Sequence, residues 1–81
     1  MTNREKLRHL FLDVFLLGPD EFNFDLRRDQ VETWDSLGVV SLAVGIQEAF
    51  GYHLTPEEAL RIREVQDIID ILTARGIPFD A

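Results

Sequence analysis

Apolar residues recur along the first part of the chain at the three- and four-residue spacing of one helix face. The set consists of Leu7, Leu10, Phe11 and Val14. Thr2 and Glu5 have the spacing of a capping box just before it, and Gly18-Pro19 ends the pattern. We therefore expect a first amphipathic helix of about 14 residues.

A second helix is expected from Ser36 to Phe50, because no proline interrupts this segment between the N-cap residue Asp35 and the terminating Gly51. At about 100° per residue its apolar side chains divide between two faces. The core face consists of Val39, Leu42, Ala43, Ile46 and Phe50. A second set, here called the outward stripe, consists of Leu37, Val40 and Val44, interleaved with Ser36, Ser41, Gln47 and Glu48. Gly38 is expected at an outward or flanking position, and Gly45 away from the core face, where glycine simply weakens a helix.

Two further helices follow. Thr55-Pro56-Glu57-Glu58 combines a capping residue, a proline suited to the first helical position and a capping-box glutamate. That helix should be short, since the charged segment from Arg61 to Glu64 interrupts the apolar rhythm. The last helix should end at Arg75-Gly76, with Pro78 just beyond. Its apolar stripe consists of Val65, Ile68, Ile69 and Leu72.

The connection between the first two helices, residues 18 to 35, is long and rich in acids. Phe22, Phe24 and Leu26 alternate along it as if they fix it to a core, so we expect an ordered loop. A short strand over Phe22 to Leu26 is the competing interpretation, but no second strand signal offers it a partner. With 81 residues, the chain suits a single all-α domain over residues 1 to 81, with three longer helices and one short third helix.

Composition excludes several classes of function. A formal charge of −7 argues against nucleic acid and against anionic membrane surfaces, and favours basic protein partners. The absence of cysteine excludes disulfides and cysteine-ligated zinc. No apolar run is long enough for a membrane span, and no signal peptide is recognisable, so we expect a cytoplasmic protein. The arginines at positions 27, 28, 61 and 63 are expected on solvated faces or in local ion pairs.

The outward stripe has two interpretations that periodicity alone leaves open. The acidic loop could fold over Leu37, Val40 and Val44 and bury them. Alternatively, these side chains form a docking surface, with Glu48, Asp35 and Glu32 as a charged rim that steers basic partners.

Ser36 is also open to two interpretations. At the first turn of a helix, free N–H groups and the positive end of the macrodipole suit a phosphate ester. Spacing alone favours the simpler role, in which Ser36 helps Asp35 to cap the helix. A hydrolytic nucleophile would need a base, and nothing in the sequence brings His9 or His53 to Ser36. Neither histidine begins a metal-ligand spacing, so we expect neither an enzyme nor a metal site.

The segment Trp34-Asp35-Ser36-Leu37 and the residues after it resemble the acyl carrier protein family, including its aminoacyl and peptidyl relatives. The further matching residues are Val40, Leu42, Ile46, Glu48, Phe50, Pro56-Glu57-Glu58-Ala59, Ile62, Val65-Gln66 and Ile69-Asp70. The resemblance covers essentially the whole chain. It implies a four-helix bundle in which the serine of the triplet receives 4′-phosphopantetheine from coenzyme A through a separate phosphopantetheinyl transferase.

Carried onto this sequence, the resemblance makes Ser36 the attachment residue, with Asp35 and Leu37 as the flanking motif. The thiol of the arm would hold acyl groups as thioesters. The residues implied for docking acyl-loading and acyl-transfer enzymes, through basic or apolar patches on those enzymes, are Leu37, Val40, Val44 and Glu48. The residues implied for an acyl pocket are Leu42, Ala43, Ile46 and Ile62. We expect a monomer.

One departure from the family pattern concerns charge. Carriers of general fatty-acid synthesis usually bear many acids along the second helix, whereas Ser36 to Phe50 contains only Glu48. This favours a specialised lipid or polyketide-type pathway over housekeeping synthesis. An aminoacyl or peptidyl carrier, and an unloaded interaction module that keeps the carrier fold, are the alternatives.

Overall fold

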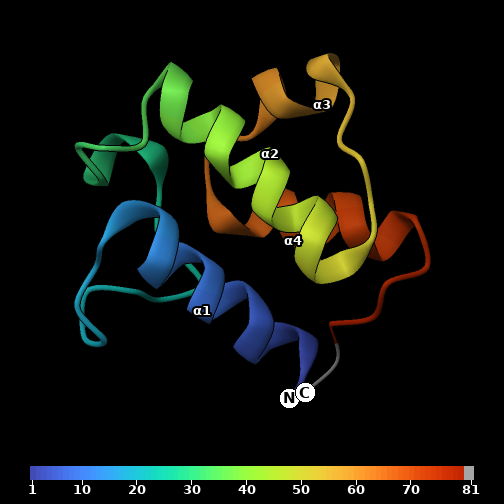
Figure 1. The fold of residues 1–81 in the computed structure, drawn as a ribbon, viewed down its shortest axis with the longest axis horizontal. Helices are drawn as coiled ribbons and strands as arrows, with labels where there is room; N and C mark the ends of the chain where they lie inside the picture. Colours follow the sequence, from blue (N-terminus) through green and yellow to red (C-terminus); the bar gives the residue numbers. More distant parts are fainter. Residues whose placement is uncertain (80–81) are drawn as a thin grey trace.

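The computed structural model describes residues 1–79, which form four α-helices and one 3-10 turn (Figure 1). The helices are α1 (Asn3–Phe15), α2 (Ser36–Phe50), α3 (Pro56–Arg61) and α4 (Val65–Ala74), and the 3-10 turn spans Arg28–Gln30. The all-α fold with a short third helix and a long first connection is confirmed. None of the helices in this part of the chain is both long and apolar enough to cross a membrane.

The helix boundaries follow from side-chain caps. The Glu5 N–H donates to Thr2 Oγ1 at 3.1 Å, and the Glu58 N–H donates to Thr55 Oγ1 at 3.1 Å, so both expected capping boxes form. The Gly38 N–H donates to Asp35 Oδ1 at 2.9 Å and starts α2. α1 is 13 residues long and ends at Phe15 with Leu16 as its C-cap, while α2 ends at Phe50 with the expected Gly51 as its C-cap.

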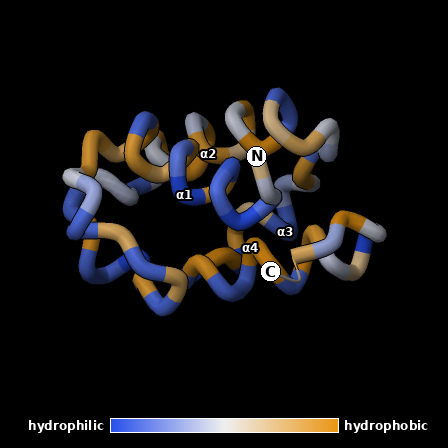
Figure 2. Tube along the Cα trace, turned by 90° about the horizontal axis from the view of Figure 1, so that it is seen from below, coloured by the Kyte–Doolittle hydropathy of each residue, from blue (hydrophilic) through white to orange (hydrophobic). Residues whose placement is uncertain are grey.

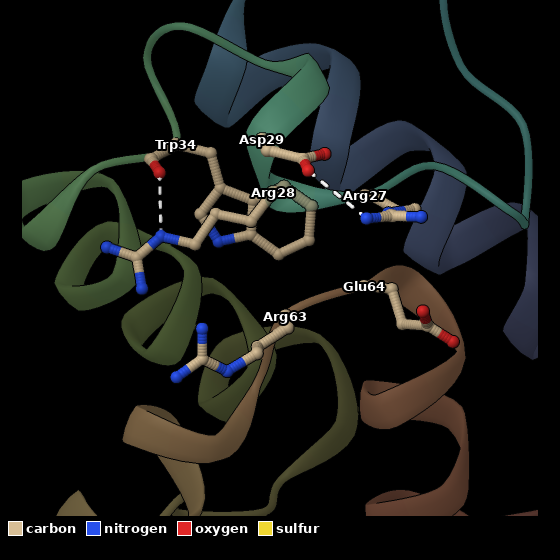
Figure 3. A pocket seen from close by; sticks show the side chains of 6 residues that line it. All are labelled: Arg27, Arg28, Asp29, Trp34, Arg63 and Glu64. Carbon is tan, nitrogen blue, oxygen red and sulfur yellow. Dashed lines mark hydrogen bonds and ion pairs between the residues drawn. The ribbon is translucent and has the colours of Figure 1, made fainter.

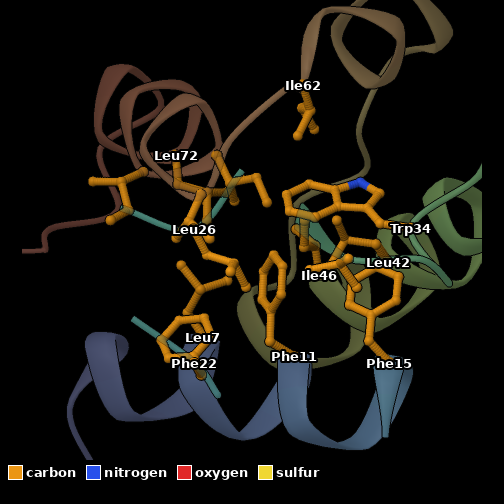
Figure 4. Close-up of a cluster of buried hydrophobic side chains, with 14 of the residues drawn as sticks. Leu7, Phe11, Phe15, Phe22, Leu26, Trp34, Leu42, Ile46, Ile62 and Leu72 are labelled. Carbon is orange, nitrogen blue, oxygen red and sulfur yellow. The ribbon is translucent and has the colours of Figure 1, made fainter. Parts of the chain in front are cut away.

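The core lies between the helices. Figure 1 shows α4 behind α2, and α1 below α2 and running along nearly the same diagonal. Figure 2, turned by 90°, separates α2 from α4 and shows hydrophobic and hydrophilic positions alternating along the helices. Side chains from all these helices and from the loop fill the space between them (Figure 4). The fully buried ones are Leu7, Phe11, Leu42, Ile46, Ile62, Val65, Ile68 and Leu72.

The long loop is ordered by its own apolar side chains, as expected. Phe22 and Leu26 are buried, and Phe24 packs against the core. An aromatic cluster joins the loop to α1, because the Trp34 ring lies 5.1 Å from that of Phe11 and 5.4 Å from that of Phe15. The competing strand does not form among residues 22 to 26.

A single β-bridge ties the loop to the connection between α3 and α4. The Arg28 N–H donates to the Arg63 carbonyl at 2.7 Å, and the Val65 N–H donates to the Leu26 carbonyl at 2.9 Å. These two hydrogen bonds bring the two segments side by side although they are far apart in sequence. They also place Arg28 and Arg63 near each other.

Two glycines of α2 lie at close contacts, and this corrects their interpretation from sequence. Gly45 faces α1, where a Cβ would overlap the end of the Leu10 side chain. Gly38 is buried rather than outward, and a Cβ there would overlap the Thr33 carbonyl and lie 2.8 Å from the Phe15 ring. Hydrophobic periodicity placed both glycines away from the core. It describes only the faces of α2 itself, and not how closely neighbouring segments of the chain approach the helix.

Candidate functional site

Ser36 is the first residue of α2, and its side chain is exposed. Asp35 caps the helix alone, since its carboxylate accepts from the Gly38 N–H. The Ser36 hydroxyl makes no hydrogen bond to any other residue in the range 1–79, so the shared capping role that spacing favoured is wrong. The site therefore combines an accessible hydroxyl with the positive end of a 15-residue helix.

Neither histidine lies beside Ser36. His53 follows α2, and its Nδ1 contacts Gln47 Oε1 at 2.8 Å. Gln47 is three turns along the helix from Ser36, about 16 Å at the rise of an α-helix. His9 lines a surface depression with Gly45 and Glu48, near the far half of α2. Residues 1–79 contain no group of three or more His, Asp or Glu side chains that could hold a metal ion.

The outward stripe is exposed, and the acidic loop does not cover it. Leu37, Val40 and Val44 are 78%, 61% and 52% exposed. Glu48 on α2, like Glu32 and Asp35 before it, is exposed as well. The structure adds Leu60, which is 74% exposed on α3, the helix that packs alongside α2 in Figure 1. Sequence reasoning missed Leu60, because a six-residue helix has too little periodicity to reveal its outer face.

The four residues implied for an acyl pocket separate into two environments. Leu42, Ile46 and Ile62 are completely buried in the core. Ala43 lines an apolar groove of about 350 Å³ between α2 and α3. The other residues of this α2/α3 groove are Val39, Val40, Val44, Gln47, His53, Leu54, Thr55, Pro56 and Ala59. Part of the outward stripe therefore also forms the groove wall.

A second cavity, of about 650 Å³, opens beside the start of α2. Its lining residues are Arg27, Arg28, Asp29, Trp34, Arg63 and Glu64 (Figure 3). Arg28 Nε donates to the Trp34 carbonyl at 2.9 Å, and Arg27 pairs with Asp29 at 3.2 Å. The Trp34 indole N–H is buried with no hydrogen-bond partner within residues 1–79, which costs about 1–3 kcal/mol for a neutral donor.

Sequence reasoning missed this cavity. Arg27 does form the expected local ion pair, but Arg28 is bound to backbone, and Arg63 lies on another segment of the chain. No sequence signal joins Arg28 to Arg63. Only the β-bridge between their segments does so.

A charged network joins α3 to the segment before it and to the end of α4. Glu58 Oε1 accepts from the Tyr52 hydroxyl at 2.5 Å, and Glu58 Oε2 pairs with the Arg75 guanidinium at 3.3 Å. The hydrogen bonds from Tyr52 and from the Thr55 N–H, with Arg75 nearby, lower the pKa of Glu58 to about 2. The same hydrogen bond raises the pKa of Tyr52. The Arg75 guanidinium also lies over the Tyr52 ring, 5.5 Å from its centroid.

Comparison with known proteins finds relatives of one kind. No model of a known protein family matches the chain. An acyl carrier protein of Syntrophus aciditrophicus is 33% identical over 80 residues, which cover 99% of this chain and all of that protein. Acyl carrier protein 2 of Ralstonia nicotianae is 31% identical over 65 residues, 80% of each chain, and an acyl carrier protein of Coprothermobacter proteolyticus is 25% identical over 68 residues. With the matching helical fold, this similarity over the full length shows that the chain belongs to the acyl carrier protein family.

Proposed function

We propose that this protein carries acyl groups on a 4′-phosphopantetheine arm attached to Ser36. The observation that carries the proposal is the exposed Ser36 hydroxyl, which has no hydrogen-bond partner within residues 1–79, since Asp35 caps α2 without it. The arm, when bound, supplies a thiol that holds the acyl group as a thioester. The chain itself has no cysteine to do so.

The surroundings of Ser36 suit a phosphodiester. Asp35 satisfies the N–H of Gly38, which leaves the N–H groups of the first helical residues available to an anion. Leu37 lies next to Ser36 and is largely exposed, so a transferase can contact it directly. Asp35 and Leu37 would thus act as the recognition motif around the modified serine.

Partner enzymes would dock on the outward stripe together with Glu48, and the exposed Leu60 on α3 offers them a further apolar contact. Glu48 is the single acid within α2, so docking here relies on apolar burial more than on charge. This composition supports a specialised lipid or polyketide-type pathway. We place the protein in the cytoplasm as a monomer of one domain.

Acyl cargo would be sheltered between α2 and α3. Each methylene removed from water contributes about 0.8 kcal/mol, which is a sufficient reason for a chain to leave solvent. The α2/α3 groove offers an apolar entrance at Ala43, and Leu42, Ile46 and Ile62 would form the interior that the chain reaches.

Intact-mass measurement tests the proposal. The purified protein is incubated with coenzyme A and a broad-specificity phosphopantetheinyl transferase, with a known carrier in the same tube. We expect one phosphopantetheine increment, localised to Ser36 by fragmentation, and none on Ser36→Ala. Ser41→Ala is the matched control, because Ser41 is also exposed on α2, and it should be modified like the unaltered protein.

An unmodified Ser36 beside a fully converted known carrier would overturn the proposal. The unloaded interaction module would then remain, and it predicts partner binding that survives Ser36→Ala. If Ser36 is modified, the mass of the cargo on protein from its native cells distinguishes an acyl carrier from an aminoacyl or peptidyl carrier.

A further inference from the structure

The cavity beside the start of α2 concentrates positive charge on an otherwise acidic protein. Three of the chain's eight Lys and Arg residues line it, while the whole chain has a formal net charge of −7. Arg27 and Asp29 neutralise each other through their ion pair. Arg28 and Arg63 then face a single remaining acid, Glu64, so the cavity retains one net positive charge.

Figure 3 shows how these groups are arranged. The guanidinium groups of Arg28 and Arg63 point to the same side of the cavity, and Glu64 lies on the opposite side. Within the described residues, Arg63 makes no side-chain hydrogen bond or ion pair, and only the Nε of Arg28 is engaged. The two guanidinium groups therefore keep most of their donors free.

The indole of Trp34 adds a third donor. Trp34 is 2% exposed and lines the cavity, and its buried N–H has no partner. In Figure 3 the indole nitrogen lies on the side of the ring toward the two guanidinium groups. Two guanidinium groups with free donors and one unpartnered indole N–H thus belong to the lining of one cavity.

We propose that this cavity binds a carboxylate of a small organic acid between Arg28, Arg63 and the Trp34 N–H. Guanidinium groups present paired N–H donors that match the two oxygens of a carboxylate. A monoanion matches the single net charge of the cavity, whereas a phosphate dianion would exceed it. An acid that displaces the Arg28 side chain slightly also gives the indole N–H its missing acceptor.

The carboxylate has two sources that share this chemistry: a free acid, or the free end of an acyl cargo derived from a dicarboxylic acid. The second source rests on the proposed function. The position allows it, because the Trp34 carbonyl bound by Arg28 is two residues before Ser36, a span of at most about 7 Å. The cavity would then select cargo that ends in a carboxylate.

The first experiment tests a free acid, and its readout is the indole resonance of Trp34. Since Trp34 is the only tryptophan, the ¹H–¹⁵N spectrum contains one indole signal. Monomethyl succinate, a monocarboxylate, should shift that signal in a saturable way, and the neutral dimethyl ester should not. An equal response to both esters, or tighter binding of inorganic phosphate, would overturn the carboxylate assignment.

Arg63→Gln is the decisive variant, because it removes a cavity cation without removing any side-chain hydrogen bond or ion pair among residues 1–79. We expect its affinity for monomethyl succinate to fall by about ten-fold or more, as for loss of a charged hydrogen bond. The matched control is Arg61→Gln, since Arg61 is exposed, pairs with Glu57 at 3.9 Å and lies outside the cavity. Equal losses in both variants would contradict the site.

In the tethered experiment the transferase moves succinyl- or butyryl-phosphopantetheine from the corresponding acyl-coenzyme A onto Ser36 and releases 3′,5′-adenosine bisphosphate. A shifted indole signal in the succinyl form only, absent in Arg63→Gln, identifies the cargo as the source of the carboxylate. A response to free monomethyl succinate only identifies a separate acid. No shift of the indole signal in either experiment overturns the proposal. Failure to load Ser36 would refute the carrier function, while the free-acid experiment would still show whether the cavity binds a carboxylate.

Discussion

Gly38 illustrates how one residue positions the candidate site. It lies two residues after Ser36, and its N–H is the group that Asp35 caps. Its missing side chain allows the Thr33 carbonyl and the Phe15 ring to pack directly against the first turn of α2. The start of the helix is therefore held by the end of α1 and by the loop together.

Gly38→Ala should destabilise the protein by about 1–3 kcal/mol, because the new methyl group meets backbone that cannot move aside cheaply. Gly45→Ala is the control. There the methyl meets the end of the flexible Leu10 side chain, and a gain of about 1 kcal/mol in helix propensity offsets the crowding. Urea unfolding measures both variants, and similar free energies of unfolding would contradict the distinction.

At the scale of elements, α3 depends on contacts outside itself. A helix of six residues is too short to be stable alone. Glu58 connects α3 to the preceding loop through its hydrogen bond with Tyr52, and to the end of α4 through its ion pair with Arg75. Because α3 forms one wall of the α2/α3 groove, these contacts also hold that groove in shape.

The lowered pKa of Glu58 predicts a pH dependence of stability. A carboxylate with a folded pKa of about 2 and an ordinary value of 4.5 stabilises the fold fully above about pH 5, and this contribution is lost as pH falls toward 2. Glu58→Gln keeps the size and capping ability but removes the charge. We expect a loss on the order of 1–2 kcal/mol at pH 7 and a flatter stability curve between pH 5 and 2.

Unfolding by urea at several pH values checks this. Glu57→Gln is the matched control, because Glu57 is 86% exposed and its pair with Arg61 is long, at 3.9 Å. The free energy of unfolding of Glu57→Gln should equal that of the unaltered protein at each pH value. If Glu58→Gln retains the full acid dependence, then other carboxylates are responsible for it.

At the scale of the whole molecule, the apolar stripe and the cationic cavity are formed by different residues, although both lie near the start of α2. The outward stripe lies on α2, and the exposed Leu60 lies on α3. The cationic cavity lies between the loop and the connection before α4. A partner that docks on the stripe would reach Ser36 through Leu37, at the end of α2 that also lies beside the cavity.

Leu37→Gln should lower kcat/KM for modification of Ser36 by about ten-fold, since burying one leucine at an interface is worth roughly 1.5–3 kcal/mol. Leu16→Gln is the control, because Leu16 is 86% exposed at the end of α1 and is not part of the stripe. The unfolding transition should be unchanged in both. Equal kinetic losses in the two variants would show that docking does not depend on the stripe.

The four helices, their caps and the acidity of the chain were determined by the sequence itself, because capping boxes, terminating glycines and helical periodicity act between residues close along the chain. Only the tertiary structure showed which apolar face of α2 is exposed to solvent. It also showed that Gly38 and Gly45 lie at close contacts, and that Arg28 and Arg63 line one cavity with Trp34. These features depend on segments that are distant in sequence and are brought together by the β-bridge and the packing of the core. Local patterns describe each segment's own faces, and only the fold determines what each face meets.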